Sequence, residues 1–170
     1  MFHAFDNDGP NKECSRSEWM ALLARAPLPL LEQALQPLEP SRKTEWLRRP
    51  ETGLYMVQGR AGGTGDRFNL GEITVTRCAL RYRAQGAEDS PVGVAYVLGR
   101  SHRQAELAAL ADALLQEPDQ QALLMEHLLN PVREHLALQA AQRQLRAQAT
   151  KVDFFTVARE AGSDNEEEDE

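Results

Sequence analysis

A glycine-rich segment between two expected strands carries the strongest chemical signal in the sequence. It reads Arg60-Ala61-Gly62-Gly63-Thr64-Gly65-Asp66-Arg67. Glycines permit positive φ angles, and consecutive amide N–H groups in such a loop can bind an anion. Arg60 and Arg67 would add charge-assisted hydrogen bonds to a phosphate group. The segment matches neither a Walker A loop nor a GxGxxG turn that opens a helix, so an ordinary hairpin connection is the alternative to a phosphate contact.

A second basic cluster follows the loop along the expected strands. It comprises Thr74, Thr76, Arg77, Arg81, Arg83 and Gly99-Arg100. Alternate residues of a strand share a face, so Arg77, Arg81 and Arg83 are expected to point the same way. Such a face either binds a polyphosphate or an acidic partner, or it is simply the solvated side of a sheet.

The residue types that usually carry catalysis or bind metals are few and scattered. The four histidines are His3, His102, His127 and His135, and the two cysteines are Cys14 and Cys78. No HxH, HxxxH, CxxC or GxSxG spacing occurs among them. We therefore predict no catalytic residue and no metal site in this chain, and no cofactor bound by it.

The net charge of −7 over 170 residues hides an uneven distribution. The last eight residues hold six acids and no base, which leaves residues 1–162 at −1. The segment from Arg42 to Arg103 contains eleven basic and six acidic residues, which gives it a local charge of +5. The overall acidity therefore does not exclude an anionic ligand, and it points to the middle of the chain as the region that would bind one.

The periodicity of the apolar residues, and the glycines and prolines that separate the periodic segments, predict an α+β domain. Ser15-Arg16-Ser17-Glu18 spells a capping box for a helix that runs to about Ala26, and a second short helix ends before Pro37. No long helix separates the strand-like segments that follow, which favours an antiparallel sheet of about four strands. The expected strands are Arg42–Arg49, Gly53–Arg60, Gly71–Arg83 and Val92–Leu98.

The chain is predicted to be helical from Ser101 onward, in three helices. Asn130-Pro131 resembles an N-cap with proline in the first helical turn, so the last helix is expected from Pro131 to about Arg159. That helix would span roughly 43 Å, more than its own domain can cover. We interpret it as a helix that packs against a partner chain, the alternative being a long surface helix. The partner-facing residues would be Leu138, Leu145, Val152, Phe154 and Phe155.

The domain boundaries follow from composition. Residues 1–14 are expected to be a disordered lead, residues 15–160 a single α+β domain, and residues 161–170 an acidic disordered tail. The first residues do not resemble a signal peptide, and no run of 18 apolar residues occurs, so the expected location is the cytoplasm.

Several short sequence motifs occur together in the order that is typical of one protein family. Taken as a set, they resemble the PhnG family of the bacterial carbon–phosphorus lyase system, which serves phosphonate use. The resemblance covers about residues 15–160. The motifs are Glu51-Thr52-Gly53-Leu54, Arg60 to Gly65 with Arg67-Phe68, Gly71 to Arg77, Gly99-Arg100, Ala105-Glu106, Ala109-Leu110, Asp112-Ala113-Leu114 and Val152-Asp153-Phe154-Phe155-Thr156.

This resemblance implies an accessory subunit in a hetero-oligomer. Its partners would be PhnH-, PhnI- and PhnJ-type chains, with ATPase-like PhnL- and PhnK-type proteins, and neither nucleic acid nor membrane. The complex would displace adenine from ATP by a phosphonate, which gives an α-D-ribose 1-phosphonate 5-triphosphate. The iron–sulfur cluster and S-adenosylmethionine would belong to the PhnJ-type chain. Family members often carry histidine where Gln104 stands, so no proton-transfer role is expected there.

The sequence predicts one functional surface made of the loop and the neighbouring strand. It would contact either the phosphate groups of the substrate or a partner subunit. A scaffold without substrate contact and an independent nucleotide-binding module are the alternatives. The residues of this surface are Arg60, Gly62, Gly63, Thr64, Gly65, Arg67, Thr76 and Arg77.

Overall fold

The computed structural model describes residues 14–37, 43–83 and 91–152, and it has the α+β order expected from the sequence. Two compact units are distinguished, Met1–Ala137 and Leu138–Glu170, and each is described by itself. The elements in chain order are α1 (Arg16–Leu23), α2 (Leu28–Leu35), β1 (Lys43–Arg60), a short 3-10 turn (Ala61–Gly63), β2 (Arg67–Arg83), β3 (Val92–Leu98), α3 (His102–Leu115), α4 (Pro118–Leu124), a π-helical turn (Met125–Leu129) and α5 (Asn130–Ala149).

The sheet has three described strands in the order β1-β2-β3, all antiparallel, rather than about four. The two strands expected over residues 42–60 are one strand, β1, and that prediction was wrong. Pro50 does not end the strand because the register with β2 shifts between Arg48 and Glu51, and the proline is left out of the pairing. In this sheet β1 is an edge strand, where a missing N–H group is tolerated.

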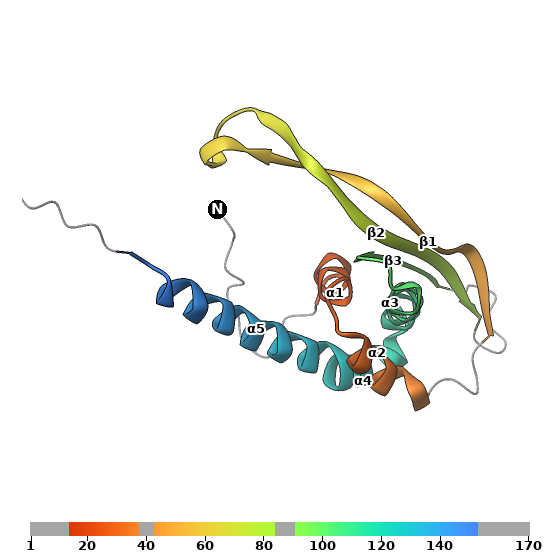
Figure 1. Ribbon diagram of the computed structural model, residues 1–170. Coiled ribbons are helices and arrows are strands. Elements are labelled where there is room, and N and C mark those ends of the chain that lie inside the picture. The colour runs from red at the N-terminus through yellow and green to blue at the C-terminus, as the bar shows by residue number, and fades with distance from the viewer. Residues whose placement is uncertain (1–13, 38–42, 84–90, 153–170) are drawn as a thin grey trace, which may run out of the picture. The chain divides into compact units, whose positions relative to one another are not determined.

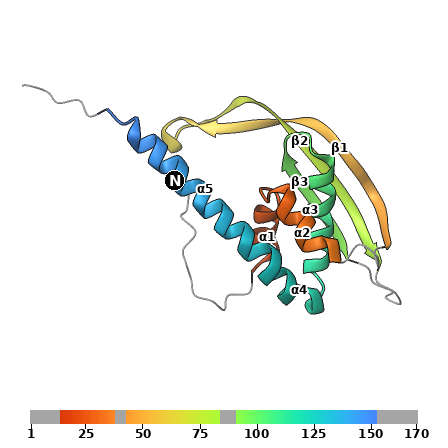
Figure 2. The same cartoon turned by 60° about the horizontal axis from the view of Figure 1, so that its bottom comes forward.

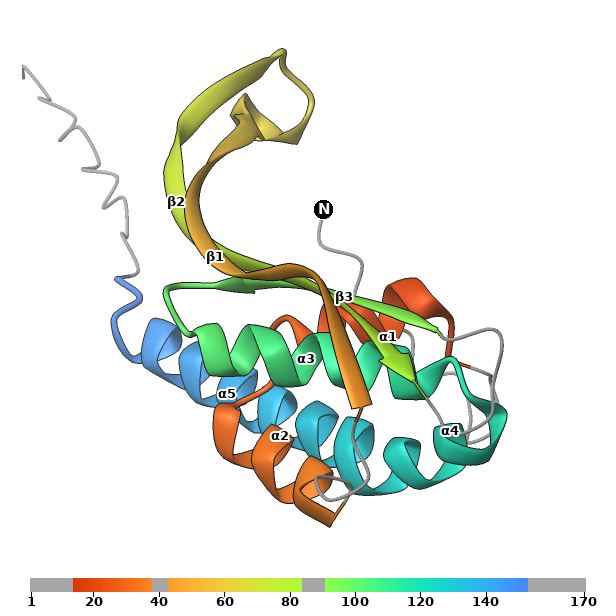
Figure 3. The same cartoon turned by 90° about the vertical axis from the view of Figure 1, so that its right-hand side faces the viewer.

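One face of the sheet carries the core. Thr76, Cys78 and Leu80 of β2 are buried, whereas the residues between them are partly or well exposed, so side chains alternate between the core and the outer face. Helix α3 packs directly on β2 and β3, with α1 and α2 on the same side of the sheet (Figures 1 and 3). Gly93 allows this close approach, because a Cβ there would lie 1.8 Å from the carbonyl oxygen of Ala109.

A buried carboxylate ties α1 to this core. Asp112 of α3 is fully buried and accepts hydrogen bonds from the Arg16 guanidinium (2.8 Å), the Trp19 indole (2.8 Å) and the Val94 amide (2.9 Å). A buried charge of this kind is tolerated because each of its oxygens is paired. The link fixes the N-terminal helix against α3 and β3.

The helix around Pro131 is continuous, so the prediction that Asn130 is the N-cap of a separate last helix was wrong. Asn130 has helical φ and ψ, and its amide N–H donates to Met125 O, five residues back. Proline cannot donate to the carbonyl four residues before it and its ring crowds that group. The wider π-helical turn before Pro131 is where such an irregularity is accommodated. The chain therefore passes from α4 into α5 without a break (Figure 2).

The unit that begins at Leu138 contains the rest of α5, which ends at Ala149 rather than near Arg159. Three of the residues expected to face a partner are about two-thirds exposed, namely Leu138, Leu145 and Val152. The other two residues of that set, Phe154 and Phe155, lie outside the described residues. That these residues pack against a partner chain stays a prediction.

Strands β1 and β2 continue well past the end of β3. The last row with three strands is Gly53, Val75 and Leu98, and beyond it β1 and β2 pair only with each other as far as Arg60 and Arg67. We call residues 54–74 the arm. Its strand segments, residues 54–60 of β1 and 67–74 of β2, span roughly 23–27 Å at the usual rise of a strand. The arm extends beyond the end of β3 and away from the helical layer (Figure 3).

Candidate functional site

The glycine-rich loop forms the tip of the arm. Arg60 and Arg67 are the closing pair of the hairpin and lie directly opposite each other. The loop between them contains Gly62 and Gly63 at φ angles of 59° and 80°. These left-handed conformations explain the glycines, because residues with a Cβ adopt them at a cost. All the loop residues except the half-buried Gly65 are exposed.

Internal hydrogen bonds use part of the loop's binding capacity. The amide N–H groups of Thr64 and Gly65 both donate to Ala61 O, and an Arg60 Nη1 donates to Gly65 O at 3.2 Å. These two amides are therefore not available to the anion that the sequence pattern suggested. The described contacts give the Arg67 guanidinium no hydrogen bond, and it is the group at the tip best able to take an external anion or carboxylate.

Thr76 and Arg77 do not lie at the tip. They pair with Thr52 and Glu51 at the root of the arm, nine and ten residues from Arg67, which is roughly 30 Å along a strand. Thr76 is fully buried, so it does not offer its hydroxyl to a surface ligand. The structure therefore divides the predicted surface into a tip, with Arg60 and Arg67, and a root, with Arg77.

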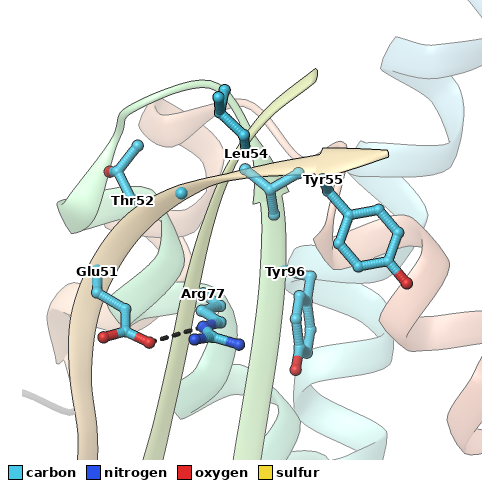
Figure 4. Close-up of a pocket in the computed structure, with 8 residues that line it drawn as sticks. Glu51, Thr52, Leu54, Tyr55, Arg77 and Tyr96 are labelled. Carbon is cyan, nitrogen blue, oxygen red and sulfur yellow. Dashed lines mark hydrogen bonds and ion pairs between the residues drawn. The ribbon is translucent and has the colours of Figure 1, made fainter. Parts of the chain in front are cut away.

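The root carries a hollow on the outer face of the sheet, opposite the helices. It has a volume of about 660 Å³ and is open to solvent. Tyr96 and Tyr55 flank it, and the Arg77 guanidinium points toward Tyr96 (Figure 4). Its lining residues are Glu51, Thr52, Gly53, Leu54, Tyr55, Val75, Arg77 and Tyr96.

Glu51 offsets part of the positive charge at this root. Its Oε1 accepts hydrogen bonds from Arg48 and Arg77, both at 2.6 Å. The hydrogen bonds from Arg48 and then Arg77 lower the pKa of the Glu51 carboxyl below its usual value. An anionic ligand would have to compete with this carboxylate, so the root suits an uncharged aromatic or apolar group better than a phosphate.

Behind the hollow, a chain of hydrogen bonds joins the root of the arm to α3. The Thr76 hydroxyl donates to Gly99 O at 2.7 Å, and Thr52 Oγ1 lies 3.0 Å from Thr76 Oγ1. The His102 ring extends the chain, with its Nε2 at 3.0 Å from Thr52 Oγ1. Sequence reasoning named Thr76 but missed Thr52 and His102 as its partners, and only the register that places residue 52 opposite residue 76 could have found them.

The rest of the arm exposes large apolar side chains from both strands. Leu54 is 66% exposed and Tyr55 63% exposed, values typical of side chains that nothing covers. Two-stranded ribbons are marginally stable in water, and exposed apolar patches of this kind usually mark interaction surfaces. The exposed apolar residues of the arm are Leu54, Tyr55, Met56, Phe68, Leu70 and Ile73.

The described parts of the chain show neither a metal cluster nor a membrane-spanning helix. Residues 14–37, 43–83 and 91–152 hold no group of three or more histidine, cysteine, aspartate or glutamate side chains that could bind a metal ion. Within the same ranges, no helix has both the length and the apolar character needed to cross a membrane.

Comparison with known proteins identifies the family. The sequence profile described as "Phosphonate metabolism protein PhnG" matches residues 14–160. The chain belongs to the PhnG family. It is 40% identical over 144 residues to the alpha-D-ribose 1-methylphosphonate 5-triphosphate synthase subunit PhnG of Rhizobium meliloti (strain 1021), an alignment that covers 85% of this chain and 88% of the relative. The resemblance drawn from the sequence is confirmed, and the arm is thus a feature of a PhnG-family chain.

Proposed function

We propose that this chain is an accessory subunit of a complex that transfers the ribosyl triphosphate group of ATP to a phosphonate. The support is the identity with a relative that is named as a subunit of alpha-D-ribose 1-methylphosphonate 5-triphosphate synthase. In the proposed reaction, a phosphonate oxygen bonds to C1′ of ATP as the bond from C1′ to adenine breaks. The products are adenine and an α-D-ribose 1-phosphonate 5-triphosphate.

The proposed partners are PhnH-, PhnI- and PhnJ-type chains, with ATPase-like PhnL- and PhnK-type proteins. The iron–sulfur cluster and S-adenosylmethionine would be held by the PhnJ-type chain, and this chain would bind no cofactor itself. We expect the isolated chain to be inactive. The observation that supports a role inside a complex is the arm, whose apolar side chains the described residues leave uncovered.

Within this complex, the tip of the arm would meet either the substrate phosphates or an acidic surface of a partner. Arg60 and Arg67 lie side by side across the closing pair, and like charges placed directly opposite each other destabilise a hairpin. An anion or carboxylate beside them would remove that repulsion. The tip residues Gly62 to Gly65 hold the two strand ends, and with them these arginines, in place.

The test is co-expression with the neighbouring subunits, followed by mass measurement and steady-state kinetics of the purified complex. The variants are Arg67→Ala and Gly63→Ala, and Arg83→Ala at the other end of β2 is the matched control. If the tip contacts substrate, Arg67→Ala lowers kcat/KM at least tenfold in a complex of unchanged mass, and the control does not. Wild-type kcat/KM with intact assembly would remove the substrate contact.

The same experiment distinguishes a scaffold from a substrate-binding subunit. If the tip variants fail to co-purify with the other chains while Arg83→Ala assembles, the tip is a docking element and contacts no substrate. Removal of residues 163–170, which hold six of the acids, is a further control and is expected to leave complex formation intact.

A further inference from the structure

The open edge of β1 has two halves of different character. Over residues 43–52 it carries Pro50, two irregularities of pairing and five charged residues. Prolines, bulges and charges are the devices by which proteins protect an edge strand from pairing with another chain. Over Gly53–Gly59 the edge has no charged residue and no proline. The protection therefore stops where the arm begins.

The backbone of β1 is regular along this unprotected half. The pairing with β2 runs without interruption from Glu51 opposite Arg77 to Val57 opposite Gly71. At the irregularity that follows, Gln58 pairs with Asn69, so the extra residue, Leu70, belongs to β2. A bulge in β1 itself would bend its edge away from a neighbour, and none is present over residues 53–59. The free N–H and C=O groups of this edge thus form a continuous, curved template for another strand (Figure 3).

The side chains beside this edge also lack a cover. Leu54 is 66% exposed, Tyr55 63% and Met56 43%, and they alternate between the two faces of the arm. A strand added next to β1 would place its own side chains beside them on both faces. It would also convert a two-stranded ribbon into a three-stranded sheet, which is the smallest arrangement with appreciable stability of its own.

The charges at the tip indicate what such a strand carries. Arg60 and Arg67 lie opposite each other, and in the part of the chain that the structure describes neither forms an ion pair with a carboxylate. The β1 edge is thus uncharged over seven residues, and its end keeps a net positive charge because Asp66 offsets only one of the two arginines. A complementary strand is uncharged and alternately apolar along Gly53–Gly59, and it has an aspartate or glutamate next to Arg60.

We propose that a partner subunit of the complex adds a strand of this composition to the Gly53–Gly59 edge of β1. This inference rests on the proposed function, since it takes its occupant from another polypeptide of the same complex. Main-chain hydrogen bonds supply affinity in this mode of binding, and the apolar and acidic side chains supply the register.

The decisive measurement is hydrogen–deuterium exchange of residues 53–59 in the free full-length chain and in the purified complex. We expect exchange of the outward-facing amides to slow at least a hundredfold on assembly, since hydrogen-bonded amides of a sheet open rarely. An assembled complex in which these amides exchange as in the free chain overturns the inference and leaves the proposed function standing. Failure of the wild-type chain to assemble overturns both.

Two variants test the edge directly. Leu54→Lys places a charge in the unprotected half at a side chain that is mostly exposed, and it is expected to weaken assembly at least tenfold. Leu47→Lys, at a 47% exposed position of the protected half, is the matched control and is expected to assemble as the wild type. Equal assembly of the two variants would contradict the inference. Slowed exchange in the free chain that grows with its concentration would also overturn it, because the occupant would then be a second copy.

Discussion

His102 Nε2 lies 3.0 Å from Thr52 Oγ1, and the hydrogen bonds around this contact determine which ring nitrogen carries the proton. Gly99 O is an acceptor only, so the single hydroxyl proton of Thr76 is used there. Thr76 must then accept from Thr52, which uses the proton of Thr52 as well. His102 Nε2 is left as the donor, and in the neutral ring Nδ1 carries the lone pair.

This arrangement predicts the tautomer of His102. Nitrogen-15 NMR of the ring should show Nε2 protonated and Nδ1 unprotonated when the histidine is neutral. Thr52→Val removes the acceptor and should abolish this preference, at a cost of about 1 kcal/mol in the free energy of unfolding. Thr74→Val, two residues from Thr76 on the same strand, is the control and should change neither. A proton on Nδ1 in the wild-type protein would contradict the deduced chain.

The buried carboxylate of Asp112 gives a second prediction. Asp112→Ala leaves the Trp19 indole, the Val94 amide and the Arg16 guanidinium without their acceptor, and it should lower the free energy of unfolding by about 3–5 kcal/mol. Urea unfolding followed by tryptophan fluorescence measures this directly. The exposed Glu45, which pairs with Arg83, is the control, and Glu45→Ala should leave the urea midpoint unchanged. Equal effects of the two substitutions would show that burial does not govern these pairs.

Local signals in the sequence predicted most of the elements. The capping box at Ser15 is present, with Glu18 accepting from the Ser15 amide at 2.7 Å. In β2, residues two positions apart share a face, as the sequence predicted, although the mixed composition of both faces did not show which one is buried. Both features depend only on residues close in sequence, and this is why they could be found without the structure.

The root of the arm could not be predicted in this way. Glu51 and Arg77 are 26 residues apart, and Thr52 and His102 are 50 apart, so their contacts depend on the strand register and on the placement of α3. Pro50 also indicated a break within β1, because only the strand order shows that β1 is an edge strand, where a proline is tolerated. The tip loop was found, but its internal hydrogen bonds depend on φ angles that the glycines permit without specifying.

The position of Gly93 gives a prediction about how α3 packs against the sheet. A Cβ at this position would lie 1.8 Å from Ala109 O and 2.8 Å from the Ala113 amide nitrogen, both of them backbone atoms of α3. Gly93→Ala must push the helix off the sheet and should destabilise the protein by about 3 kcal/mol or more. Gly53 has nothing within 4 Å of the same position, so Gly53→Ala is the matched control and should unfold at the wild-type temperature or above it.

Thermal unfolding followed by circular dichroism checks this pair of variants. A Gly93→Ala protein with the wild-type melting temperature would mean that α3 does not approach the sheet as closely as its backbone atoms indicate. Loss of stability in Gly53→Ala alone would instead show that the arm, and not the packing of α3, limits stability.

The thiol of Cys78 links stability to alkaline pH. The side chain is 1% exposed, and burial, with a smaller contribution from Glu106, raises its pKa to about 12. In the unfolded chain the thiol titrates near its ordinary value of 9.0. The contribution is therefore fully present below about pH 9 and is lost as the pH rises toward 12, because only the unfolded state releases the proton in that range.

A comparison of Cys78→Ala with the wild type isolates this effect from the other groups that titrate in the same range. The free energy of unfolding, measured in urea at several values between pH 8 and pH 11, should fall more steeply for the wild type by about 1.4 kcal/mol per pH unit above pH 9. The cavity left by the substitution lowers stability equally at every pH, so it shifts the variant's curve without changing its slope. Parallel curves would mean that the thiolate forms as easily in the folded protein as in the unfolded chain, which a thiol buried against α3 and the sheet does not allow.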